Sequence, residues 1–142
     1  MPKKILVLLI LTFIFCGCNN NKNKPVLPPG ETLPGIGKRY SFFTAIGPVR
    51  TSTNDPTPYA VVVEMVIGYD PGDKSCEKEL TSKVDELRDF VKNYFHRKPA
   101  SDLVPENEAR IKTEIIELLN TRVLNKSKVR IITFNAFDVL EM

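Results

Sequence analysis

Three segments of the chain have the apolar pattern of β-strands. Residues Tyr59–Tyr69 are almost continuously apolar and β-branched and end at the turn residues Asp70–Asp73, which predicts a strand with both faces largely covered. Residues Tyr40–Gly47 are aromatic and β-branched and predict a short strand that residues 48–51 continue. Residues Val129–Leu140 predict a strand that closes the chain.

Between these strands the apolar residues recur at helical spacing. The first set predicts one helix of about four turns, whose apolar face consists of Leu80, Val84, Leu87, Val91, Tyr94 and Phe95. Pro99 ends this helix, and Leu103–Pro105 offers the start of a second one, since proline suits a first turn. The buried stripe of the second helix is predicted to be Ile111, Ile115, Leu118, Leu119 and Val123.

The resulting order, β-β-α-α-β, predicts an α+β fold. Because both helices fall together between strands, the simplest architecture is a small antiparallel or mixed sheet with two helices packed on one face.

The N-terminus has the pattern of an export signal. Lys3 and Lys4 precede an apolar run over residues 5–15, which is shorter than the about 20 residues that a spanning helix needs. Gly17–Cys18 resembles the end of a bacterial lipobox. We therefore predict a signal peptide at residues 1–17 and acylation of Cys18 at the mature N-terminus. The alternative is an uncleaved anchor helix, which would leave the Cys18 thiol free.

Residues 18–37 form the predicted lipidated N-terminus and a flexible tether. Asparagine, proline and glycine dominate this segment, and its apolar residues show almost no periodicity. Two interpretations remain open: a spacer that holds the domain away from the bilayer, and a leader without a spacing function. The folded domain is predicted at residues 38–142.

Charge argues against nucleic acid as a partner. The chain has 20 Lys and Arg against 17 Asp and Glu, a net charge of +3. Removal of the signal takes Lys3 and Lys4 away, so the mature protein is nearly neutral. Binding through counterion release needs a larger excess of positive charge, and we predict no nucleic-acid partner.

The residue types that carry chemistry are sparse, and we predict no catalytic residue, no metal site and no cofactor. His96 is the single histidine, and its place beside Arg97 at a predicted helix end suggests interaction with the helix dipole. Cys76 is interpreted as a structural cysteine, although a thiolate near a helix start is the alternative. Two further sets are interpreted structurally, as a solvated helix face and as core aromatics: Asp85, Glu86 and Asp89, and Tyr94, Phe95, Phe134 and Phe137.

The order and spacing of these segments resemble a known family. The residues that carry the resemblance are Tyr59–Tyr69, Glu86–Asp89, Tyr94–Phe95, Leu103, Glu108, Ile111–Lys112, Glu114–Ile115, Leu119–Asn120, Leu124, Val129–Phe134, Phe137 and Val139. Together they are similar to the C-terminal domain of the flagellar basal body-associated FliL family, over about 80 residues.

The resemblance implies a non-enzymatic periplasmic domain with a stomatin/prohibitin-like fold. Such a protein associates with itself in a ring or partial ring around flagellar stator units at the basal body, and supports rotation and motility. The family offers no catalytic residues to carry over. A ring requires two different contact patches on each copy, and the exposed faces of the two helices are the candidates.

The N-terminus departs from the family pattern, which has a longer membrane-spanning helix. A lipid on Cys18 would instead hold the domain at a bacterial membrane, facing the periplasm. Retention at the inner membrane keeps the domain beside the stators, whereas export to the outer membrane does not. The alternative function is therefore a lipid-anchored binding module for a periplasmic or surface ligand, which would need a concave pocket.

Overall fold

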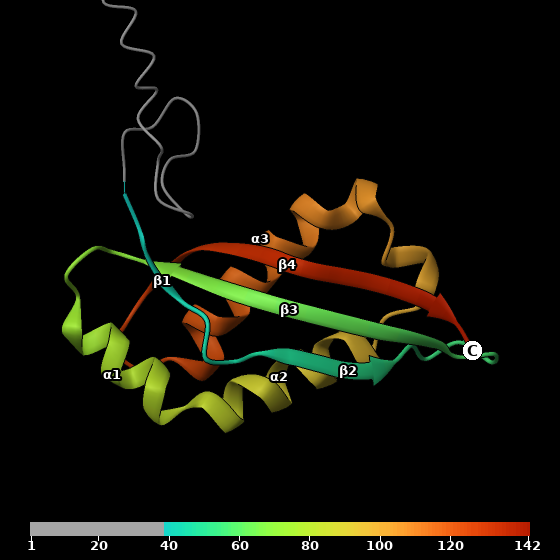
Figure 1. Ribbon diagram of the computed structural model, residues 1–142, viewed down its shortest axis with the longest axis horizontal. Coiled ribbons are helices and arrows are strands. Elements are labelled where there is room, and N and C mark those ends of the chain that lie inside the picture. The colour runs from blue at the N-terminus through green and yellow to red at the C-terminus, as the bar shows by residue number, and fades with distance from the viewer. Residues whose placement is uncertain (1–38) are drawn as a thin grey trace, which may run out of the picture.

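The structure is a computed structural model that describes residues 39–142 of the chain. A long central strand organises this part of the chain. This strand, β3 (Tyr59–Tyr69), pairs along its whole length with β4 (Val129–Glu141). Strands β1 (Ser41–Phe43) and β2 (Pro48–Ser52) follow one another along its opposite side. All pairs are antiparallel, so β4 lies at one edge of the sheet and β1 and β2 share the other (Figure 1).

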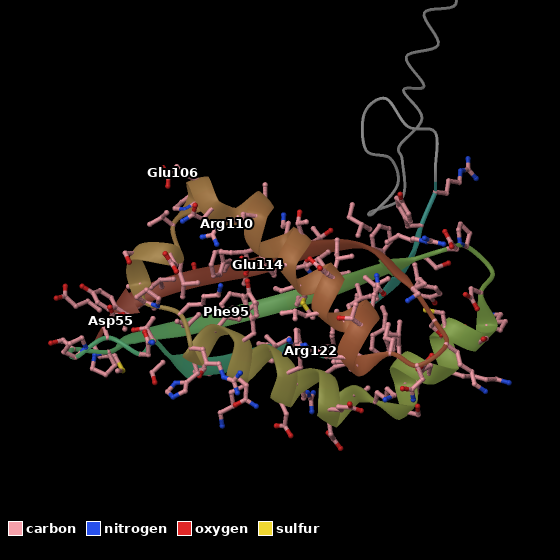
Figure 2. The ribbon with its side chains drawn as sticks, turned by 180° about the vertical axis from the view of Figure 1, so that it is seen from behind. Asp55, Phe95, Glu106, Arg110, Glu114 and Arg122 are labelled. Atoms are coloured by element: carbon pink, nitrogen blue, oxygen red, sulfur yellow. The ribbon has the colours of Figure 1, made fainter. Side chains whose placement is uncertain are left out.

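The helices lie together on one face of this sheet, as Figures 1 and 2 show from opposite sides. In chain order they are α1 (Lys74–Ser82), α2 (Val84–His96), the 3₁₀ turns η2 (Ala100–Asp102) and η3 (Pro105–Asn107), α3 (Glu108–Leu118) and the π-helical turn η4 (Leu119–Val123). The α+β class and the one-sided helix layer are confirmed. The predicted order is wrong, because the structure has three strands and three α-helices before β4.

The predicted first strand is interrupted by a turn. Residues Thr44–Gly47 turn the chain between β1 and β2, with Gly47 at φ +66°, a conformation that favours glycine. Ile46 is fully buried in the core, and its carbonyl accepts a bond of 2.7 Å from Arg88 Nε on α2. The turn therefore inserts an apolar anchor where a continuous strand was expected.

The predicted first helix is two helices. Lys83 leaves the helical region at φ −111° and ψ 17°, and its N–H bonds to the Leu80 carbonyl instead of continuing the α-helical ladder. Just before it, the hydroxyls of Thr81 and Ser82 donate to backbone carbonyls of their own helix, a contact that bends helices. The apolar spacing passes through this break unchanged, so periodicity alone did not reveal it.

The second predicted helix begins with a 3₁₀ turn and ends with a π-helical turn. Pro105 opens η3, which leads directly into α3 at Glu108. At the other end the Leu124 N–H donates to the Leu119 carbonyl at 2.8 Å, and the π-helical turn leaves Leu119 and Val123 buried. Leu118, predicted to be buried, is only partly so.

The core lies between the sheet and the helix layer. Its largest fully buried side chains are Ile46, Val61, Val63, Met65, Ile67, Leu80, Leu87, Phe95, Ile111, Ile115, Leu119 and Ile132. Strand β3 is buried on both faces only from Met65 to Tyr69. In its first half buried and half-buried residues alternate, so the prediction that both faces are largely covered is confirmed for the second half of the strand only. The reason is that the helices cover one face, and near Gly68 the other is shielded by Phe42 and Ile131.

Candidate interaction surface

The structure assigns ordinary structural contacts to the two residues with the greatest potential for chemistry. Cys76 is fully buried in the first turn of α1, where its N–H donates to Asp73 Oδ1 at 2.9 Å. Burial raises the pKa of this thiol, which disfavours a reactive thiolate. His96 lies in the last turn of α2, as predicted, and its Nδ1 contacts the Ser52 carbonyl at 2.9 Å.

The core interpretation is confirmed for Tyr94 and Phe95, whereas Phe134 and Phe137 are half-buried and pack against the core from β4. Phe95 is fully buried, with ring centroids 5.1 Å from Tyr94, 6.2 Å from Phe134 and 5.6 Å from Phe137. Within residues 39–142, no three His, Cys, Asp or Glu side chains lie close enough together to hold a metal ion.

The helix layer carries a groove between α2 and α3. This helix groove has a volume of 630 Å³ and is lined by Phe90, Asn93, Tyr94, Arg97, Lys98, Asp102, Glu114, Leu118 and Arg122. Leu118 is half-buried here rather than in the core, and Phe90 is half-buried beside it with its ring 6.1 Å from Tyr94. The groove therefore combines an apolar floor with charged rims.

A network centred on Glu114 fixes one wall of the helix groove. The Tyr94 hydroxyl donates to Glu114 Oε2, Lys98 Nζ lies 2.9 Å from the same oxygen, and Arg110 contacts Oε1 at 3.1 Å. The Tyr94 bond and the Lys98 ammonium lower the pKa of Glu114, whereas burial and the neighbouring Glu114 raise the pKa of Tyr94. Figure 2 shows Arg110 and Glu114 on α3 and Arg122 beyond its end.

Charge along α2 changes sign from its start to its end. Asp85 and Asp89 are exposed near the N-terminus, whereas Arg97 follows the C-terminal turn and Arg122 lies across the helix groove from it. Among the described residues these four make no ion pair, unlike Lys98 and Arg110. The predicted solvated face of the acidic residues is confirmed, whereas no sequence pattern indicated that Arg97 and Arg122 share a groove. Only packing brings these two side chains to one groove.

A second hollow lies under the free edge of β4. It has a volume of 640 Å³, and its apolar lining includes Leu103, Val104, Phe134, Phe137 and Val139. Polar groups at its rim come from Tyr59, Glu108 and Asp138. Apolar walls with few polar groups are typical of sites that hold small ligands or extended peptides.

The predicted export signal, tether and lipidation site, at residues 1–17, 18–37 and Cys18, lie outside the described residues. None of the helices described in residues 39–142 has the length and hydrophobicity needed to span a bilayer.

Comparison with known proteins identifies a flagellar relative of the chain. Over 100 residues the chain is 43% identical to the flagellar protein FliL of Treponema pallidum (strain Nichols). The match covers 70% of this chain and 55% of that relative, so it spans about half the length of the relative. No protein-family model matches the chain.

Proposed function

Because the chain belongs to the FliL family, we propose that it is a non-enzymatic protein of the flagellar motor. In this role it assembles around stator units at the basal body and supports rotation and motility. The observation that carries the proposal is the identity of 43% over 100 residues to a flagellar protein. The family resemblance also implies a stomatin/prohibitin-like arrangement of the domain, which is part of the same proposal.

Self-association of this kind needs two different, complementary patches on each copy. The helix layer offers such a pair. Asp85 and Asp89 form an acidic patch at the start of α2, and Arg97 and Arg122 form a basic patch at the helix groove. Contact between the acidic patch of one copy and the basic patch of the next would build a ring or partial ring without any change of fold.

The proposed location follows from the N-terminus. A lipid on Cys18 and the tether at residues 18–37 would hold the domain at the bacterial membrane, facing the periplasm. Cys18→Ser should abolish incorporation of a fatty-acid label and move the protein out of the membrane fraction. Unchanged labelling and fractionation would instead support the anchor-helix alternative.

Deletion of the gene tests the motor role. We expect mutant cells to swim slowly or not at all, and the tagged protein to co-purify with basal bodies. Normal swimming speed and torque, together with absence from purified basal bodies, would contradict the proposal.

The second candidate function is a lipid-anchored binding module for a periplasmic or surface ligand. The hollow under β4 favours it, because Phe134 and Phe137 give it the apolar walls that ligand sites use. Oligomeric state separates the two functions. A ring or lateral oligomer of the full-length protein supports the motor role, whereas a monomer that binds a ligand in this hollow supports the binding module.

A further inference from the structure

The cleft between β2 and α2 is lined by groups that donate hydrogen bonds. It has a volume of 400 Å³, and its lining residues are Arg50, Thr51, Ser52, Lys92, Asn93 and His96. No carboxylate side chain is among them. A hollow that collects donors without an acidic residue is suited to an anion, since each donor and each cation then favours the same ligand.

The positive charges of this cleft come from two different elements and are not neutralised. Arg50 is exposed on β2, and Lys92 is exposed on α2 one turn before His96. Within residues 39–142 neither Arg50 nor Lys92 makes an ion pair. Like charges that face one hollow repel each other, so a bound anion would relieve a repulsion that the fold otherwise tolerates.

The backbone of β2 adds donors to the same cleft. Thr53 N–H donates to the Tyr59 carbonyl at 3.0 Å, so Thr53 points its backbone groups toward β3. These directions alternate along an antiparallel strand, so the backbone groups of Ser52 and Arg50 point away from β3. The contact of His96 Nδ1 with the Ser52 carbonyl agrees with this direction. The N–H groups of Arg50 and Ser52 therefore lie on the edge that α2 flanks (Figure 1).

The histidine is oriented by the same strand. A carbonyl oxygen only accepts hydrogen bonds, so the bond to Ser52 requires the proton of the neutral His96 ring to lie on Nδ1. The imidazole is thereby held at the rim of the cleft beside Lys92. His96 therefore forms part of the rim of the cleft, and Arg50 and Lys92 supply its positive charge.

We propose that the β2–α2 cleft is a binding site for a phosphate group. Arg50 and Lys92 would contact the phosphate oxygens, and hydroxyl and N–H donors of the β2 residues that line the cleft would complete the donor set. Two sources share this chemistry: free inorganic phosphate and the phosphodiester headgroup of an anionic lipid. The proposal does not depend on the flagellar role.

Titration of the full-length protein in a non-ionic detergent tests the proposal. Inorganic phosphate is used in one calorimetric titration, and a short-chain phosphatidylglycerol below its micellar concentration in another. We expect saturable one-site binding of at least one probe, weakened about tenfold or more in Arg50→Gln/Lys92→Gln, because two charge-assisted contacts are lost. The control Lys78→Gln/Lys126→Gln removes the same charge from exposed positions outside the cleft and should change affinity less than twofold.

The two probes distinguish the sources. Binding of inorganic phosphate alone assigns the cleft to the free ion, and binding of the lipid probe, lost in the cleft variant, assigns it to a headgroup. Absence of binding by both probes overturns the proposal, as does equal weakening in the cleft and control variants. Lys92→Gln alone, on an exposed helix position, keeps the test valid if the double variant unfolds.

Discussion

The carboxylate of Glu79 joins two segments that are far apart in the sequence. Its Oε1 accepts the N–H of Asn125 at 2.6 Å, and its Oε2 accepts those of Lys126 at 3.4 Å and Ser127 at 3.0 Å. The Ser127 side chain and these N–H groups lower the pKa of Glu79 to about 2. The Ser127 hydroxyl itself has no partner within hydrogen-bond distance among the described residues. The hydrogen bonds that hold the Glu79 carboxylate therefore come from the three backbone N–H groups.

Replacement of Glu79 should make stability less dependent on pH. The folded pKa is below the ordinary value of 4.5, so the stabilisation is complete above about pH 4.5 and is lost as pH falls toward 2. We expect Glu79→Gln to lower the free energy of unfolding by about 1 kcal/mol at pH 7, a modest value because solvent screens this partly exposed carboxylate. Thermal unfolding of both proteins between pH 7 and pH 2 measures the difference. Glu106→Gln, at an exposed carboxylate, is the control, and a gap that does not narrow in acid contradicts the assignment.

Gly68 lies where the neighbouring residues leave no room for a side chain. A Cβ atom at this position would lie 2.2 Å from Ile131 Cγ2 and 3.3 Å from the ring of Phe42. We expect Gly68→Ala to lower the free energy of unfolding by about 1–3 kcal/mol, because the β4 side chain must move. Denaturant unfolding of Gly68→Ala, Ile131→Ala and the double variant tests the contact. If the two single effects add without coupling, crowding by Ile131 is not the cause.

At the start of β4, the side chain of Asn120 makes the hydrogen bonds that a neighbouring strand would otherwise make. Asn120, in η4, donates from Nδ2 to the Val129 carbonyl at 2.9 Å and accepts the Val129 N–H on Oδ1 at 2.7 Å. The amide thus satisfies both backbone groups that point away from β3. Lys83 secures the other side of the same turn through a 2.8 Å bond to the Val123 carbonyl.

Loss of the Asn120 amide should detach the π-helical turn from the sheet. We expect Asn120→Ala to cost about 2 kcal/mol and to speed hydrogen exchange of the Val129 amide, because both backbone groups lose their partners. Asn120→Asp keeps an acceptor for the Val129 N–H and should retain part of the protection. In the neighbouring variant Asn125→Ala, the replaced side chain is exposed and makes no hydrogen bond within residues 39–142, so exchange at Val129 should be unchanged. Equal exchange in all variants would show that Asn120 does not hold this edge.

Apolar periodicity predicted where the long strands lie but not where the chain breaks between shorter elements. Strand β3 begins and ends where its apolar run predicted, and β4 extends one residue beyond its predicted end. By contrast, the breaks at Lys83 and at Thr44–Gly47 depend on backbone conformation and on the burial of Ile46, and neither disturbs the apolar spacing. The apolar spacing does not reveal the π-helical turn either, because Leu119 and Val123 have the spacing of an ordinary helix.

At the scale of the whole molecule, the proposed assembly depends on the two charged patches of the helix layer. We expect Asp85→Lys/Asp89→Lys and, separately, Arg97→Glu/Arg122→Glu to weaken self-association about tenfold or more, since each places like charges across the contact. An equimolar mixture of the two variants should associate again, because the reversed patches complement each other. Sedimentation velocity of the full-length protein in detergent measures this. Lys78→Glu/Lys126→Glu is the control, and failure of the mixture to recover would exclude these patches as the contact.

The fold class, the central and final strands and most of the buried faces of the helices could be predicted from the sequence. These follow from local periodicity and residue chemistry, which each segment carries regardless of its neighbours. Tertiary structure alone decided which exposed side chains meet. Arg97 and Arg122 line one groove because α2 and α3 lie on the same face of the sheet, and Arg50 and Lys92 line one cleft because β2 and α2 border it. Exposed positions have no apolar pattern that marks them, so the surfaces that bind a partner emerge only when the elements are packed.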